Sequence, residues 1–166
     1  MTLCLGEGAT SGSCVFAKMN CVLFEDDEGQ LRDWMCIICS LMDHITRPEH
    51  ALSTTVTAWR GSKLSHLQAS SLRAGEVILP PMFVTASASK QIAEVFQVNY
   101  LIRLCIPAAC RHAGLVREVA GCSEVMLLPY TPVRVMEIGT DAIIRVYVLE
   151  SKVEQHSRAP CRSFPI

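Results

Sequence analysis

Three polar positions in the middle of the chain could carry chemistry, although each lies beside apolar sequence. Arg60 follows two apolar residues in "TAWRGSKL", hydroxyl side chains gather over residues 85–89 in "FVTASASK", and Glu124 begins the apolar run "SEVMLLPY". A guanidinium can hold two phosphate oxygens at any working pH, and a carboxylate stabilises positive charge that develops in a transition state. Taken singly, each position also has an ordinary interpretation as a solvated strand end, a capped turn or the start of an edge strand.

Other catalytic and metal-binding motifs do not occur in the sequence. It has no glycine-rich phosphate loop and no GxSxG elbow, and its five histidines form neither HxH nor HxxxH. Cys36 and Cys39 form a single CxxC within an amphipathic stretch, which we interpret as a pair of core thiols. We therefore expect no metal. A weaker hypothesis gathers five cysteines into a metal or iron–sulfur site: Cys36, Cys39, Cys105, Cys110 and Cys122.

Length, charge and cysteine content narrow the class of protein. The 166 residues suffice for one domain with its own core, and the net charge of -1 supplies no positive field for nucleic acid. Nine cysteines, an odd number, favour a reducing compartment. The sequence shows no signal peptide and no run of 18 apolar residues. We expect no nucleic-acid or membrane partner and a cytoplasmic or otherwise intracellular location, with secretion by a leaderless route left open.

The elements that would position these side chains follow from periodicity. Apolar residues at a spacing of three and four predict a helix over residues 30–45, which Pro48 ends. Residues 89–96 predict a short helix with Ser89 as N-cap. Short apolar and β-branched runs predict strands within residues 53–60, 75–87, 99–107, 123–130, 131–139 and 142–151.

This order of elements predicts an α+β fold with a split, mainly antiparallel sheet. We expect a mobile lead-in over residues 1–13, a single domain over 14–151 and a polar tail over 152–166. Within the domain, the helical part covers about 19–47 and the β core about 53–151. The segment 111–121, "RHAGLVREVAG", is interpreted as a loop.

The order and surroundings of these motifs resemble the Arg-Ser-Glu class of mono-ADP-ribosyltransferases, which includes clostridial-toxin-like and vertebrate arginine-specific enzymes. "AWRG" at 58–61 matches the arginine strand of that family, and "FVTASASKQIAEVF" at 83–96 is similar to its aromatic-Ser-Thr-Ser motif and following helix. "CSEVMLLPY" at 122–130 is similar to the second half of its Glu-x-Glu motif. Residues 19–45 resemble its Asn-anchored helical segment, and "IIRVYVLES" resembles its closing strand. The resemblance covers most of the chain.

The resemblance implies an ADP-ribosyltransferase-like fold and transfer of ADP-ribose from NAD to a protein acceptor, with release of nicotinamide. NAD would be the substrate and an unidentified protein the partner. Arg60 would face a cleft and hold the pyrophosphate, and Gly61 would hold the nicotinamide amide through its backbone. Glu124 would hold the ribose 2'-hydroxyl, and Thr85 and Ser87 fall on the first and last residues of the Ser-Thr-Ser motif. Glu124, Thr85 and Arg60 are the expected catalytic set.

The chain departs from the family pattern at three positions. Thr85 stands where the family has serine, Ala86 removes a hydroxyl, and Cys122 stands where arginine-modifying members carry a glutamate. A thiol is a poor partner for an acceptor guanidinium, so arginine specificity is not implied, and Glu118 is a candidate for the missing carboxylate. Two other functions stay open: an NAD glycohydrolase, and a degenerate member that binds NAD or a protein without turnover.

Overall fold

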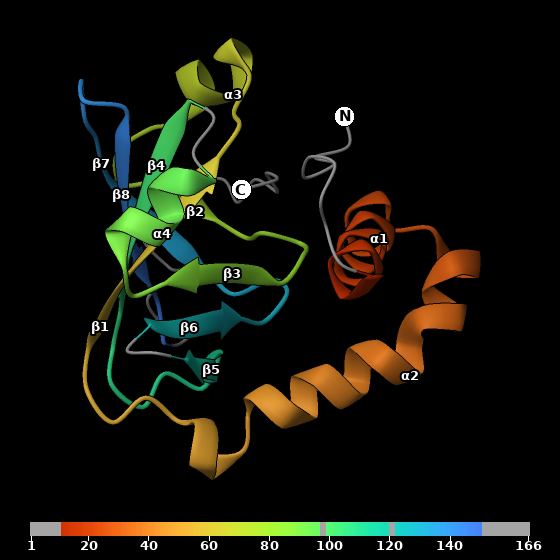
Figure 1. Ribbon diagram of the computed structural model, residues 1–166. Helices are drawn as coiled ribbons and strands as arrows, with labels where there is room; N and C mark the ends of the chain where they lie inside the picture. The colour runs from red at the N-terminus through yellow and green to blue at the C-terminus, as the bar shows by residue number, and fades with distance from the viewer. Residues whose placement is uncertain (1–10, 97–98, 120–121, 151–166) are drawn as a thin grey trace.

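A helical hairpin begins the computed structural model, which describes residues 11–96, 99–119 and 122–150. α1 (Ser11–Glu25) and α2 (Glu28–Ile45) lie together on one side of the β-sheet (Figure 1). α1 begins within residues 1–13, for which the sequence predicted a lead-in; the rest of that segment and the predicted tail lie outside the described residues. No helix in the described ranges is long and apolar enough to cross a bilayer.

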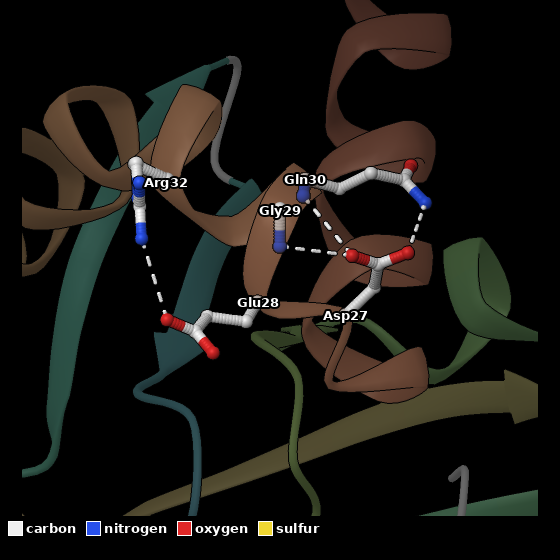
Figure 2. Close-up of polar contacts among 5 residues, drawn as sticks. All are labelled: Asp27, Glu28, Gly29, Gln30 and Arg32. Atoms are coloured by element: carbon white, nitrogen blue, oxygen red, sulfur yellow. Dashed lines mark hydrogen bonds and ion pairs between the residues drawn. The ribbon is translucent and has the colours of Figure 1, made fainter.

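The turn between the two helices is fixed by local polar contacts. Asp26 adopts a left-handed conformation with φ 53°, and Asp27 caps α2 by accepting hydrogen bonds from the backbone amides of Gly29 at 2.9 Å and Gln30 at 3.2 Å. Figure 2 shows that the Gln30 amide returns to the same carboxylate, with Nε2 3.1 Å from Oδ2. The hydrogen bonds from Gln30 lower the pKa of Asp27, so the cap stays ionised at neutral pH.

The rest of the chain forms one sheet and several short helices. Its elements are η1 (Pro48–His50), β1 (Val56–Ser62), α3 (His66–Ser71), β2 (Val77–Ile78), β3 (Val84–Ser87), α4 (Lys90–Val95), β4 (Tyr100–Ile106), β5 (Ala113–Val119), β6 (Cys122–Leu127), β7 (Val133–Ile138) and β8 (Ile143–Val148). The strand order is β2-β7-β8-β4-β1-β3-β6-β5, and every pair except β4–β8 is antiparallel. The predicted α+β fold is thus confirmed.

The sheet divides into two halves between β1 and β3. β1 pairs with β4 along its whole length, from Val56 opposite Ile106 to Ser62 opposite Tyr100. With β3 it shares a single register pair, Trp59 opposite Ser87. In Figure 1 the half containing β3, β6 and β5 crosses the half containing β4, β7 and β8 steeply. The predicted split in the sheet is therefore a place where two strands meet at one point and then separate.

Two hydrophobic clusters stabilise this arrangement from opposite faces of β3 and β6. Val125 and Leu127 on β6 lie in the larger cluster, together with Ala58 of β1 and Val84 and Ala86 of β3. Met126 of β6, with Phe83 just before β3 and Leu128 just after β6, packs against residues of α1 and α2 in a second cluster: Met19, Leu23, Ile38, Ile45, Phe83, Met126 and Leu128. Because successive strand residues point to opposite faces, β6 is apolar on both, whereas β3 carries Thr85 and Ser87 on the face that Phe83 shares.

β5, α3 and η1 were not predicted from the sequence, and the run predicted within residues 75–87 forms two strands, β2 and β3. Residues 113–119 form the edge strand β5 and not the predicted loop, and residues 66–71 form α3. α3 begins with a capping box, in which the Ser65 hydroxyl accepts from the Gln68 amide and the Gln68 side chain accepts from the Ser65 amide. The pattern Ser-x-x-Gln that specifies this box is present in the sequence and marks the helix start.

The interpretation of the CxxC pair as core thiols is wrong. Cys36 and Cys39 are both exposed on α2, whereas Ile38 between them is buried. The apolar stripe of the helix runs through Leu31, Trp34, Ile38, Leu41, Met42 and Ile45, so the two cysteines fall outside the stripe that packs on the sheet.

We predict that Gly114→Ala destabilises the fold, because Gly114 lies where the end of α2 meets β5. A Cβ atom at Gly114 would collide with the Ile45 carbonyl oxygen and would lie 3.0 Å from Ile45 Cγ2. Overpacking of this kind costs about 1–3 kcal/mol, which corresponds to a fall of roughly 3–10 °C in Tm for a domain of this size. Thermal unfolding measures the effect, with Gly29→Ala at an exposed helix position as the control. Equal Tm values for the two variants would contradict the prediction.

Candidate active site

Arg60 lies at the point where β1 and β3 separate. Its neighbour Trp59 makes the only register pair between the two strands within the described residues, and Ala58, two positions earlier, is buried in the larger hydrophobic cluster. The Arg60 side chain bridges the gap beyond this pair: its Nη1 donates to the Thr85 backbone carbonyl at 2.8 Å and to the Thr85 hydroxyl at 2.9 Å. One guanidinium nitrogen thus connects the two halves of the sheet.

The rest of the Arg60 guanidinium is only partly satisfied. Its Nε is fully covered and has no hydrogen-bond partner, although the residue as a whole is half-buried, and no ion pair to Arg60 occurs among the described residues. Burial lowers the pKa of Arg60 to about 10, so the side chain remains a cation at neutral pH. A covered cation without a carboxylate partner, with one donor unused, has the properties of an anion-binding group. Arg60 was expected to face a cleft, whereas in the structure its Nε is enclosed.

The hydroxyl positions and Glu124 lie on the two strands next to Arg60. In the ladder between β3 and β6, Thr85 is opposite Met126 and Ser87 is opposite Glu124. Residues two apart share a strand face, so Thr85, Ser87 and Glu124 continue the face that Phe83 and Met126 bury under the helices. Glu124 itself is exposed, whereas Ser87 is buried and its hydroxyl accepts from the Ser89 amide at 3.1 Å.

Ser89 precedes α4 but does not make the capping contact that was expected. The Ser89 side chain makes no cap hydrogen bond; its amide instead binds back to Ser87. α4 is held against β1 by the Trp59 indole, whose ring centroid lies 5.5 Å from Lys90 Nζ and 5.7 Å from Arg103 Cζ. Lys90 begins α4, so its cation–π contact joins α4 to the strand that carries Arg60, whereas Arg103 belongs to β4.

The remaining candidate residues occupy positions close to these strands. Gly61 follows Arg60 on β1 and is opposite Leu101 of β4. Glu118 is opposite Ser123, and a register shift between β5 and β6 places Arg117 opposite Glu124. Cys122 begins β6, opposite Val119. The side chains of Cys122 and Glu118, the two acceptor-recognition candidates, lie outside what the structure describes.

Two asparagine side chains hold the strands on either side of the gap. Asn20 of α1 donates to the Phe83 carbonyl and accepts from the Phe83 amide, both at 3.1 Å, at the entry to β3. Asn99 does the same for Leu64 just beyond β1, accepting from its amide at 3.0 Å and donating to its carbonyl at 2.6 Å. Each amide side chain replaces a missing backbone partner. The sequence resemblance includes an Asn-anchored helical segment, but no spacing rule identifies Asn99.

Cysteine and acidic side chains do not form a metal centre in the described part of the chain. No group of three or more His, Cys, Asp or Glu side chains lies close enough to hold a metal ion among the described residues. Of the cysteines in the iron–sulfur hypothesis, Cys110 is buried, and burial raises the pKa of its thiol. Cys36 and Cys39 are exposed on α2, and Cys105 is half-buried on β4.

Comparison with solved structures assigns the fold. The Vis toxin, an ADP-ribosyltransferase from Vibrio splendidus, matches with a TM-score of 0.71 at 17% identity, over 90% of this chain and 73% of that chain. The ADP-ribosyltransferase C3larvin from Paenibacillus larvae matches at 0.61 and 17%, over 85% of this chain and 96% of the other. Exoenzyme S from Pseudomonas aeruginosa, in complex with human 14-3-3 protein beta and bound to carba-NAD, matches at 0.59 and 13%, over 89% and 73%.

The chain therefore has the fold of the ADP-ribosyltransferase toxins. No protein-family model matches the sequence, and no curated protein sequence matches it.

We predict that Arg60→Met does not destabilise the protein at pH 7. Burial in the folded state lowers the pKa of Arg60 to about 10, so the folded protein is disfavoured by the desolvated charge at every pH below about 10. Methionine keeps an apolar stem and removes the charge, and replacing a buried charge in this way is often neutral or stabilising. Thermal unfolding should give a Tm equal to or above that of the wild type.

The difference in stability between the wild type and Arg60→Met should depend on pH. As the pH rises through about 10, the folded wild type loses the Arg60 proton before the unfolded chain does, so wild-type stability rises with pH and the stability advantage of Arg60→Met narrows. Arg111→Met, at an exposed position between β4 and β5, is the control. A fall of about 5 °C or more for Arg60→Met at pH 7, roughly 1–2 kcal/mol for a domain of this size, would mean that the hydrogen bonds to Thr85 outweigh the desolvation.

Proposed function

We propose that the protein is an NAD-dependent mono-ADP-ribosyltransferase that transfers ADP-ribose from NAD to a protein acceptor and releases nicotinamide. The observation that carries this proposal is the Arg60 guanidinium, a covered cation with an unpartnered Nε and no carboxylate partner among the described residues. The fold shared with the Vis toxin, C3larvin and exoenzyme S supports it, since the first two are ADP-ribosyltransferases and exoenzyme S was crystallised with carba-NAD.

Arg60 would bind the donor through its pyrophosphate. That group is a dianion, and a guanidinium offers donors in a planar fork that matches phosphate oxygens. Thr85 holds one end of the guanidinium through two hydrogen bonds, which leaves the other nitrogens to the ligand. A bound anion would also stabilise the positive charge that burial disfavours, so its binding should raise the pKa of Arg60 again.

Glu124 would act on the sugar. In the reaction the bond between nicotinamide and the ribose C1' breaks, nicotinamide leaves with the bonding electrons, and an acceptor nucleophile attacks C1' and loses its proton. Positive charge develops on the ribose as the bond breaks, and a carboxylate that accepts from the 2'-hydroxyl stabilises this state more than the ground state. Glu124 is exposed, opposite Ser87 on the next strand and therefore close to the donor site.

Thr85 and Ser87 would orient these groups. The Thr85 hydroxyl accepts from Arg60 and retains its own proton, so it can donate to a ligand oxygen. The Ser87 hydroxyl accepts from the Ser89 amide and holds the start of α4 next to Glu124. Gly61 adds no side chain at the end of β1, which leaves its backbone groups open to the nicotinamide amide.

The second candidate function is an NAD-binding module without turnover. One observation favours it: the Thr85 hydroxyl and carbonyl already hold Arg60, so the first hydroxyl of the motif is engaged in an internal contact. Water as acceptor, giving NAD glycohydrolase activity, is a variant of the first candidate. Both candidates predict NAD binding, and only the first predicts nicotinamide release.

The test is nicotinamide release from NAD by the wild type and by Glu124→Gln, with NAD binding measured by calorimetry on both. Because Glu124 acts mainly in the transition state, we expect kcat to fall by about 100-fold or more while the Kd for NAD changes by less than about threefold. Glu137→Gln, an exposed glutamate on β7, is the control. Release by the wild type that persists in Glu124→Gln would contradict the role of Glu124.

Arg60→Lys completes this experiment. Lysine keeps the charge but has no planar fork, so the Kd for NAD should rise by about tenfold or more. NAD binding without release by the wild type would support the module without turnover. If the wild type neither binds NAD nor releases nicotinamide, the chain shares only the fold of the transferases.

Acceptor choice gives a further prediction. Cys122 stands where arginine-modifying enzymes carry a glutamate, so we propose an acceptor other than arginine unless Glu118 supplies the carboxylate. If Glu118 does so, Glu118→Gln should lower transfer to the acceptor by about tenfold or more and leave the release of nicotinamide to water unchanged. Unchanged transfer in Glu118→Gln would remove Glu118 from the site.

A further inference from the structure

A second unpartnered polar atom lies two residues from Arg60 on the same strand. Ser62 ends β1 and is 4% exposed, and its hydroxyl, like the Arg60 Nε, is fully covered and has no hydrogen-bond partner. These are the two such side-chain atoms in the described residues. The Cα atoms of residues i and i+2 of a strand are roughly 6.6 Å apart and their side chains project to the same face, so Arg60 and Ser62 share one face of β1.

Their coincidence requires a physical explanation. Buried polar side-chain atoms in folded proteins nearly always have a partner, because an unmade hydrogen bond leaves the cost of desolvation uncompensated. The guanidinium Nε can only donate, and the serine hydroxyl can donate as well. The missing partner is therefore a hydrogen-bond acceptor, and beside a cation without a carboxylate it is best met by an anion.

The position of Ser62 is also firmly fixed. Its backbone lies opposite Tyr100 of β4, and its carbonyl accepts from the Asn99 amide at 3.4 Å. Two residues further along the chain, the Asn99 side chain binds both backbone groups of Leu64. The strand end is thus held by β4 and Asn99 on one side, while on the other side it has already separated from β3, which it meets only at Trp59.

We propose that Ser62 is a second ligand of the donor pyrophosphate, binding one phosphoryl group through its hydroxyl while Arg60 binds the same diphosphate through Nε and its free nitrogens. This inference rests on the proposed function. Ser62 would supply a neutral hydrogen-bond donor at the end of β1, next to the charged donors of Arg60, and would contact only the diphosphate part of the ligand. Ser62 is a binding residue and takes no part in bond cleavage.

The experiment compares two ligands that differ in the pyrophosphate. ADP-ribose contains it, and nicotinamide riboside does not; both are titrated calorimetrically into the wild type, Ser62→Ala and Ser62→Thr. We expect Ser62→Ala to raise the Kd for ADP-ribose by about tenfold and to leave the Kd for nicotinamide riboside unchanged. Ser62→Thr, which keeps a hydroxyl, should recover most of the affinity. Thr57→Val, which removes a half-buried hydroxyl elsewhere on β1, is the control and should change neither Kd.

Each other outcome has a definite meaning. An unchanged Kd for ADP-ribose in Ser62→Ala would overturn the inference and assign an internal water to the two groups, while ADP-ribose binding that is lost in Arg60→Lys would preserve the proposed function. Equal losses for both ligands would mean that Ser62 acts through the shape of the site and would also overturn the inference. If Ser62→Ala does not fold, Ser62→Cys, close in size with a weak donor, takes its place. Failure of the wild type to bind ADP-ribose would overturn the proposed function and the inference together.

Discussion

The bridge from Arg60 to Thr85 is the interaction on which the rest of the site depends. β1 and β3 meet at one register pair, and beyond it their backbones no longer satisfy each other. The guanidinium spans this opening and binds both the carbonyl and the hydroxyl of Thr85. A neutral NH2 group could donate to the same two oxygens, but it would not carry the charge that an anionic ligand requires. The contact that joins the two half-sheets is therefore also the origin of the proposed binding site.

The surrounding structure holds this opening from outside. The apolar faces of β3 and β6 are covered by two separate hydrophobic clusters, so neither strand can move toward β1 without uncovering apolar surface. Asn20 acts at the start of β3 and Asn99 just beyond the end of β1, each providing both a donor and an acceptor to one residue of the backbone. Because the folded protein already holds the charged site in place, little of the binding free energy is needed to order the site when the ligand binds.

Much of this architecture could be predicted from the sequence, and the exceptions have physical causes. The three-and-four spacing over residues 30–45 predicted α2, and the order of the Arg60, Thr85 and Glu124 motifs suggested the fold. β5 was missed because Gly114 and the charged residues near its end weaken the strand pattern of an edge strand. The covered Ser62 hydroxyl and the Asn99 contact depend on where β1 and β3 separate, and no local sequence pattern predicts that position.

The order of strands in the sheet also has a consequence for folding kinetics. β1, β3 and β6 are neighbours in space but are separated in the chain by two helices and three other strands, and β8 joins β4 in parallel from still further along. In such non-local pairings, large loops must close before any stabilising contact forms, and the entropy lost on loop closure slows folding. During synthesis, Arg60 leaves the ribosome long before Thr85 and Glu124 can lie beside it. A nascent or partly folded chain therefore has no assembled site, and the ability to engage a ligand should arise only at the last step of maturation.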